Sequence, residues 1–144
     1  MAEIPAFDVW ETTVDETEYA DPLWRMAAYR FARYAMDSGW PDVRVLSRTH
    51  ATRGVASQLY EALGSIAAHI AEGYSRSSGP DRVRFFEYAL GSARECIAWY
   101  RAACPVLGAD VCNKRIATLV RIRRLLLTAI PSERTRSLRR TNPR

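Results

Sequence analysis

The sequence has 144 residues, and 48% of them are hydrophobic, which is enough for one globular domain with a substantial core. No apolar run approaches the roughly 18 residues that a membrane-spanning helix needs. The acidic start, Met1–Pro5, lacks the basic-then-apolar pattern of a secretory signal peptide. We therefore expect a cytoplasmic protein without a membrane partner.

Charge is distributed unevenly along the chain. Residues 1–42 contain nine acids and three arginines, a net charge of −6, whereas residues 43–144 contain eighteen bases and seven acids, a net charge of +11. Twenty of the 21 bases are arginine. Arginine binds phosphate in a bidentate manner, but abundant arginine and alanine also reflect a GC-rich genome, and the composition favours neither explanation.

The three cysteines, Cys96, Cys104 and Cys112, are odd in number and form no CxxC pair. They lie among alanines and aromatic residues. This placement favours small buried thiols over disulfides or metal ligands.

Residues 1–20 combine weak periodicity with many acids. They predict an acidic, extended leader. Its apolar side chains, Phe7, Val9 and Trp10, are expected to dock on the body of the protein.

A first helix is predicted from Asp21, a suitable N-cap before a proline, to about Asp37. The run Ser38-Gly39-Trp40-Pro41 predicts its end. Residues 38–50 are consistent with either a loop or a short helical turn.

A second helix is predicted to begin between Thr49 and Gly54 and to run to Glu72. Gly73 would end it by adopting the left-handed conformation. The apolar positions of this helix share one face: Val55, Leu59, Leu63, Ile66 and Ile70.

A third helix is predicted from the Ser78–Asp81 capping pattern to about Cys104, where Pro105 prevents continuation. Its main seam alternates spacings of three and four, as in a coiled coil. The seam consists of Val83, Phe86, Leu90, Ala93, Ile97 and Tyr100.

A second apolar stripe lies about 100° round this third helix, and the two stripes together exceed the single core face that a helix needs. Either the leader or another subunit should cover the excess. The second stripe therefore predicts an oligomer interface of Phe85, Ala89, Ser92, Cys96 and Trp99.

A fourth helix is predicted to begin at Gly108–Asp110 and to end at Ile130, before Pro131. Residues 132–144 are predicted to be a basic disordered tail. With no strand signal, the chain is predicted to be all-α, with an antiparallel, up-down-up-down four-helix bundle over residues 21–131.

The basic residues of the fourth helix and the tail predict a nucleic-acid-binding surface, which would be led by phosphate contacts and sensitive to salt. The alternative is a solubilising tail whose arginines are partly neutralised by the acidic leader of a neighbouring copy. The candidate residues are Lys114, Arg115, Arg121, Arg123, Arg124, Arg136, Arg139 and Arg140.

A polar stripe runs along one side of the second helix. It is interpreted as a solvated face with helix-stabilising pairs, as a polar network at a subunit interface, or, with less support, as a catalytic site. The stripe consists of Gln58, Glu61, Ser65, His69, Glu72 and Arg76.

Few residues in the sequence support a catalytic site. His69-x-x-Glu72 reverses the Glu-x-x-His order of di-iron bundles and occurs once. No Cys–His metal spacing, phosphate-binding glycine loop or nucleophile motif is present. We therefore expect a protein that is not an enzyme and that needs no cofactor or metal.

Residues from about 54 to 103 resemble a family of small bacterial four-helix-bundle proteins named for intervening sequences of 23S ribosomal RNA. The segment from Leu23 to Tyr34 is similar to that family's opening helix. The residues that carry the resemblance are Ser57-Gln58-Leu59, Ser65-Ile66, Ile70-Ala-Glu-Gly73 with Arg76, Phe85-Phe86, Ala89, Gly91-Ser92 and Glu95.

The resemblance implies a bundle that assembles as a ring, typically a homopentamer, without an assigned enzymatic activity. A related branch resembles the accessory proteins of diversity-generating retroelements, in which a basic pentamer works beside a reverse transcriptase. The resulting hypothesis is a homo-oligomer that binds RNA, DNA or a nucleic-acid enzyme through its basic surface. The alternative is a structural or adaptor protein that recruits a protein partner without binding nucleic acid.

Overall fold

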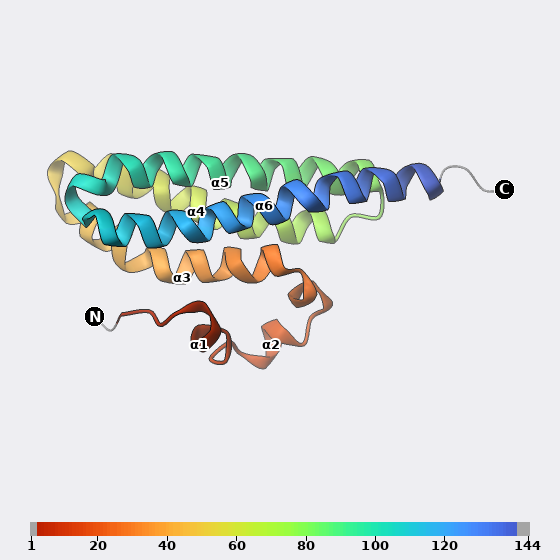
Figure 1. The fold of residues 1–144 in the computed structure, drawn as a ribbon, viewed down its shortest axis with the longest axis horizontal. Coiled ribbons are helices and arrows are strands. Elements are labelled where there is room, and N and C mark those ends of the chain that lie inside the picture. The colour runs from red at the N-terminus through yellow and green to blue at the C-terminus, as the bar shows by residue number, and fades with distance from the viewer. Residues whose placement is uncertain (1–2, 141–144) are drawn as a thin grey trace.

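The computed structural model describes residues 3–140, with side chains placed as far as Arg136. Every regular element in this range is helical, which confirms the all-α prediction (Figure 1). Four helices are long: α3 (Ala27–Arg48), α4 (Arg53–Tyr74), α5 (Gly79–Leu107) and α6 (Ala109–Arg140). The shorter elements are α1 (Phe7–Glu11), α2 (Glu16–Tyr19) and the two 3-10 helices η1 (Pro22–Arg25) and η2 (His50–Thr52).

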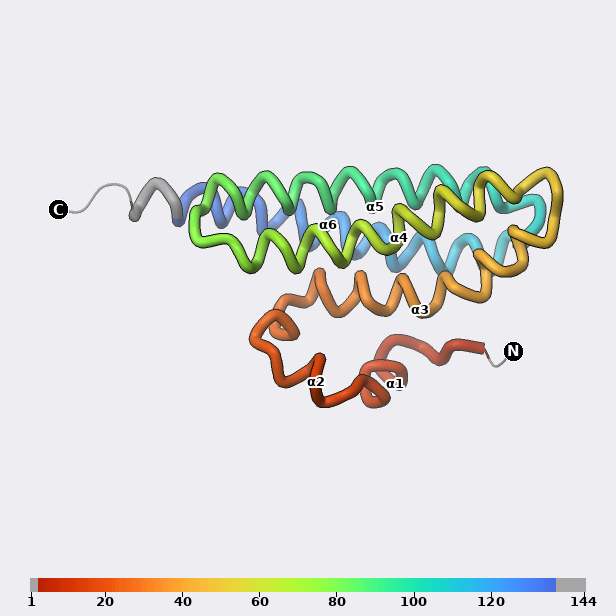
Figure 2. Tube along the Cα trace, turned by 180° about the vertical axis from the view of Figure 1, so that it is seen from behind, coloured from red at the N-terminus to blue at the C-terminus, as the bar shows by residue number. Residues whose placement is uncertain are grey.

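The long helices lie side by side. Helix α3 packs on α4 and α6, and α5 packs on the same two helices from the other side. The leader, with α1 and α2, lies along α3 on the side away from α5 (Figure 2). Within the described residues there are thus six α-helices, two of which belong to the leader.

The predicted stop at residues 38–41 is wrong, because α3 continues through it to Arg48. Gly39 serves close packing: a Cβ atom there would lie 2.6 Å from Leu63 Cδ1. An internal proline such as Pro41 costs a helix about 3 kcal/mol. Burial of Val43 and Leu46 beyond the proline contributes about 1.5–3 kcal/mol each and outweighs that cost.

Gly73 does not end α4 in a left-handed conformation, because it lies inside the helix, which extends to Tyr74. A Cβ atom at Gly73 would lie 2.8 Å from Phe86 Cε1, so the glycine is needed for the approach of α5. Among the described residues, only Gly108 has a positive φ, 88°, and its N–H caps α5 by donating to the Cys104 carbonyl.

The predicted start of α5 is confirmed, since the Ser78 hydroxyl accepts a hydrogen bond from the Asp81 N–H at 3.3 Å. The helix ends at Leu107, three residues beyond the predicted end, with Pro105 inside its last turn. The main seam is confirmed as core: its members are buried, except Ile97, which is half-buried.

The excess apolar face of α5 is covered by its own chain, and the leader is not what covers it. Helix α5 packs on both α4 and α6, so its two stripes have two partners within the chain. Ala89 and Cys96 are fully buried and therefore cannot contact another copy, which corrects their assignment to an oligomer interface. Phe85, Ser92 and Trp99 are half-buried.

The predicted end of the last helix at Ile130 is also wrong. Helix α6 continues through Pro131 to Arg140 and extends beyond the ends of α4 and α5 (Figure 1). Beyond the proline, Glu133 pairs with Arg82 of α5 at 3.2 Å, and Arg134 pairs with Glu87. Residues 132–140 of the predicted disordered tail are therefore helical, and residues 141–144 lie outside the described part of the chain.

Gly73→Ala should destabilise the protein by about 1–3 kcal/mol, because the new methyl group overlaps the Phe86 ring. Urea unfolding measures the change. Gly64→Ala is the matched control on the same helix, since a Cβ atom there meets nothing within 4 Å. The control should gain roughly 0.5–1 kcal/mol from helix propensity alone. Equal effects of the two substitutions would contradict the packing account.

Candidate nucleic-acid interface

The leader docks on α3 through aromatic side chains. The Phe7 ring stacks on Phe31 with 3.9 Å between centroids. Trp10 is only 4% exposed, and its indole N–H donates to Asp37 Oδ2 at 2.9 Å. The sequence prediction is therefore confirmed for Phe7 and Trp10, but it is wrong for Val9, which is 57% exposed.

Carboxylates of the leader also pair with cations of the body. Glu11 pairs with Arg30 at 2.7 Å, and Glu18 receives two hydrogen bonds from Arg33, at 2.8 and 2.9 Å. The bond from Arg33 lowers the pKa of Glu18 below its ordinary value. Glu3 lies 3.9 Å from Lys114 of α6. The acidic leader thus neutralises cations within its own chain, whereas the sequence analysis considered a neighbouring copy.

Arg115 is not available to bind a phosphate, which corrects its assignment. Its Nε donates to Asp42 Oδ2 at 2.7 Å, and the Tyr100 hydroxyl donates to the same oxygen at 2.8 Å. Asp42 is 5% exposed. Burial, followed by the neighbouring Asp42, raises the pKa of Tyr100 well above its ordinary value. The three side chains join α3, α5 and α6 in one buried polar cluster.

The other cations of α6 remain near the surface. Lys114, Arg121 and Arg124 are exposed, and Arg123 is half-buried. The Arg121 guanidinium lies over the Phe31 ring at 4.4 Å from its centroid. Residues 111–132 contain no acid, so this part of α6 has no negative charge of its own.

The C-terminal candidates differ in what the structure shows. Arg136 is exposed and pairs with Glu133 at 3.5 Å. Arg139 and Arg140 continue the backbone of α6, and their side chains lie outside the described part of the chain.

The members of the predicted polar stripe do not form one site: His69 and Arg76 contact α5, whereas Glu61 and Ser65 face the groove with α3. His69 Nδ1 lies 3.1 Å from Glu72 Oε2, and the His69 ring packs against Tyr88 of α5. Arg76 lies 4.6 Å above the centre of the Phe85 ring. Of the remaining members, Gln58 and Glu61 are exposed and Ser65 is half-buried.

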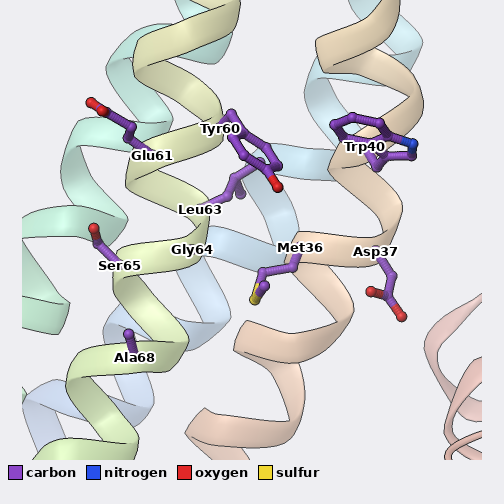
Figure 3. A pocket seen from close by; sticks show the side chains of 9 residues that line it. All are labelled: Met36, Asp37, Trp40, Tyr60, Glu61, Leu63, Gly64, Ser65 and Ala68. Carbon is purple, nitrogen blue, oxygen red and sulfur yellow. The ribbon is translucent and has the colours of Figure 1, made fainter.

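A groove of about 630 Å³ lies between α3 and α4 (Figure 3). Trp40 and Tyr60 line it from opposite helices, 47% and 57% exposed, with 5.5 Å between ring centroids. Glu61 and Ser65 of the polar stripe also line it. Trp40 could not be assigned to a helix face from the sequence, because the run Ser38–Pro41 predicts a helix end and the helix in fact continues through it.

The prediction of buried thiols is confirmed for two of the three cysteines. Cys96 and Cys112 are fully buried, while Cys104 is half-buried. Burial raises the pKa of the Cys96 thiol to about 12, so this thiol is protonated at neutral pH.

Residues 3–140 show no metal-ligand cluster and no membrane-spanning helix. No group of three or more His, Cys, Asp or Glu side chains in this range is placed to hold a metal ion. No helix in it combines the length and the apolar character needed to cross a bilayer.

Residues 43–136 match the model of the 23S rRNA-intervening sequence protein family. The chain belongs to this family. The matched region begins within α3 and includes α4, α5 and most of α6. The leader and the first part of α3 lie outside the matched region. The match to the 23S rRNA-intervening sequence proteins therefore does not include the residues through which the leader docks on α3. No curated protein matches the chain.

Arg115→Met should destabilise the protein by about 3–5 kcal/mol, because it leaves the buried Asp42 carboxylate without its cation. Lys114→Met removes the same charge at the adjacent position, where the side chain is 69% exposed, and should change stability by less than about 0.5 kcal/mol. Denaturant unfolding of both variants measures the difference. A stable Arg115→Met variant would show that Asp42 does not depend on this ion pair.

Proposed function

We propose that this chain is a non-enzymatic helical protein that associates with RNA or DNA through the exposed cations of α6. The observation that carries the proposal is the acid-free stretch of α6, in which Lys114, Arg121 and Arg124 are exposed. A row of cations on a helix segment without acids of its own attracts a phosphate backbone at long range, and the leader carboxylate of Glu3 lies 3.9 Å from Lys114. Arg115 is excluded from this surface.

The proposal that the protein is not an enzyme rests on the candidate residues themselves. His69 and Glu72 form an exposed pair on α4, without a pocket that would exclude water. The protonated Cys96 thiol lies in the core. Neither arrangement supplies an activated nucleophile or a poised acid–base pair.

We also propose that α3–α6 form an antiparallel, up-down-up-down four-helix bundle in the cytoplasm and that copies of it assemble, with a pentamer expected. The support is the likeness to ring-forming bundles and the exposed Trp40 and Tyr60. Sedimentation equilibrium should return about five times 16.3 kDa, and a mass of 16.3 kDa would contradict assembly.

Nucleic-acid binding is tested by fluorescence anisotropy with a labelled single-stranded RNA of about 20 nucleotides. Affinity should fall about tenfold or more between roughly 50 and 200 mM salt, because binding releases counterions. Combining Arg121→Gln, Arg123→Gln and Arg124→Gln should weaken binding about tenfold and reduce the salt dependence.

The control triple variant, Arg48→Gln, Arg53→Gln and Arg101→Gln, removes the same charge from exposed positions on α3, α4 and α5. It should weaken binding much less. Equal losses in both triple variants would show that only net charge matters. Affinity that does not respond to salt would contradict a phosphate-led interface.

A second candidate function, an adaptor for a protein partner, is favoured by the groove between α3 and α4. Exposed aromatic pairs such as Trp40 and Tyr60 are typical centres of protein interfaces. This function predicts no nucleic-acid binding at physiological salt. A retroelement reverse transcriptase as partner remains part of the first proposal, since it would act on the same nucleic acid.

A further inference from the structure

We propose that the face of α3 and α6 beneath the leader is itself a surface for single-stranded nucleic acid, and that the acidic leader occupies this surface in the free chain. The leader-covered face consists of Arg30, Phe31, Arg33 and Tyr34 of α3, and the exposed Arg121 of α6 borders it over the Phe31 ring. The inference rests on the proposed function, because it extends the cationic surface of α6 onto α3. It also assigns Arg30 and Arg33 a role in binding phosphate, although both lie in residues 1–42, the acidic part of the sequence.

The leader is acidic, whereas the chain as a whole is basic and two arginines of α3 pair with the leader. Residues 1–24, which comprise the leader and most of η1, contain seven acids and no base. The rest of the chain therefore has 21 bases and nine acids, a formal net charge of +12. Without the leader, Arg30 would lose its carboxylate partner and Arg33 would keep only Asp37 of its own helix, at 3.3 Å. Both arginines would then add to the positive field of α6, and a polyanion would be attracted to both helices.

The leader contacts are of the same chemical kinds as those that hold a single strand. Such strands are held by cations on phosphates and by aromatic rings on bases. In the leader, the Glu11 and Glu18 carboxylates take the positions of phosphates, on Arg30 and Arg33. The Phe7 ring takes the position of a base, stacked on Phe31.

Phe31 is contacted by two groups at once. The Phe7 ring stacks on it at 3.9 Å, and the Arg121 guanidinium of α6 lies over it at 4.4 Å. Tyr34, one turn further along α3, meets the Phe7 ring edge-on with 5.6 Å between centroids. If Phe7 leaves, a stacking platform next to three arginines opens, which is suited to an unpaired base.

The leader is held by Phe7, by the buried Trp10 and by two partly exposed ion pairs, and it is not part of the continuous core of the long helices. Helices α1 and α2 have five and four residues, too few to be stable alone. The Glu11–Arg30 and Glu18–Arg33 pairs are partly exposed, so each contributes little to stability. The continuous buried core begins at Ala28 and contains no leader residue. Exchange of the leader for a polyanion therefore leaves the packing of the long helices intact.

The test uses the full chain and two double variants of equal charge. Glu11→Gln with Glu18→Gln removes the two carboxylates that pair with α3. Asp8→Asn with Glu16→Gln removes two exposed leader carboxylates that are outside these pairs. Binding of a labelled single-stranded oligo(U) is measured at about 50 mM salt. The first variant should bind about three- to tenfold more tightly than the second.

A further variant shows where the gain arises. Adding Arg30→Gln and Arg33→Gln to the Glu11→Gln, Glu18→Gln chain should abolish the gain, because the opened face then lacks its cations. Thermal unfolding of every variant checks that the fold persists, and the paired comparison stays valid because the two double variants differ only in position.

The outcomes separate this inference from the proposed function. If the two double variants bind equally, while the Arg121, Arg123 and Arg124 substitutions still weaken binding, the leader is only a structural cover and the inference is overturned. If no form of the protein binds RNA at low salt, the proposed function fails, and this inference fails with it.

Discussion

The buried carboxylate of Asp42 is the contact on which the arrangement of the long helices depends. A carboxylate that is 5% exposed is tolerated only when cations and donors surround it, and here Arg115 of α6 and Tyr100 of α5 both bind the same oxygen. This cluster joins three helices at one level of the bundle. It also determines which cations face solvent, since it withdraws Arg115 from the surface and leaves its neighbour Lys114 outside.

Helix α3 packs on α4 and α6 with one side and binds the leader with the other. The inward side of α3 carries small and apolar residues that pack on α4 and α6, such as Ala32 and Leu46, which are fully buried. The outward side carries Arg30, Arg33 and Asp37, and each of these meets the leader. The leader also reaches α6, where Glu3 lies 3.9 Å from Lys114, and the exposed Arg121 of α6 lies over the Phe31 ring on which Phe7 stacks.

Features that depend on interactions between residues close in sequence were predicted correctly. The seam of α5 and its Ser78 cap follow from spacing and hydrogen bonding within a few residues, and both are confirmed. Pro41 and Pro131 were misread as helix ends because the contacts that outweigh them are distant in sequence: buried residues after Pro41, and ion pairs to α5 after Pro131. The Asp42–Arg115 pair spans 73 positions and leaves no trace in any local pattern. Helix α5 does have a wide apolar arc, but it packs on both α4 and α6 within the chain. The sequence alone does not show how many neighbours a helix has.

These features describe a basic helical body with an acidic segment held against it by aromatic contacts and partly exposed ion pairs. The central claim is that nucleic acid and leader compete for the same face. Hydrogen–deuterium exchange of the full chain, free and saturated with single-stranded oligo(U), tests it most directly. The account predicts that amides of residues 7–19 lose protection when RNA binds, while amides in the middle of α5 do not change. Unchanged or increased protection of the leader in the RNA-bound protein would contradict it.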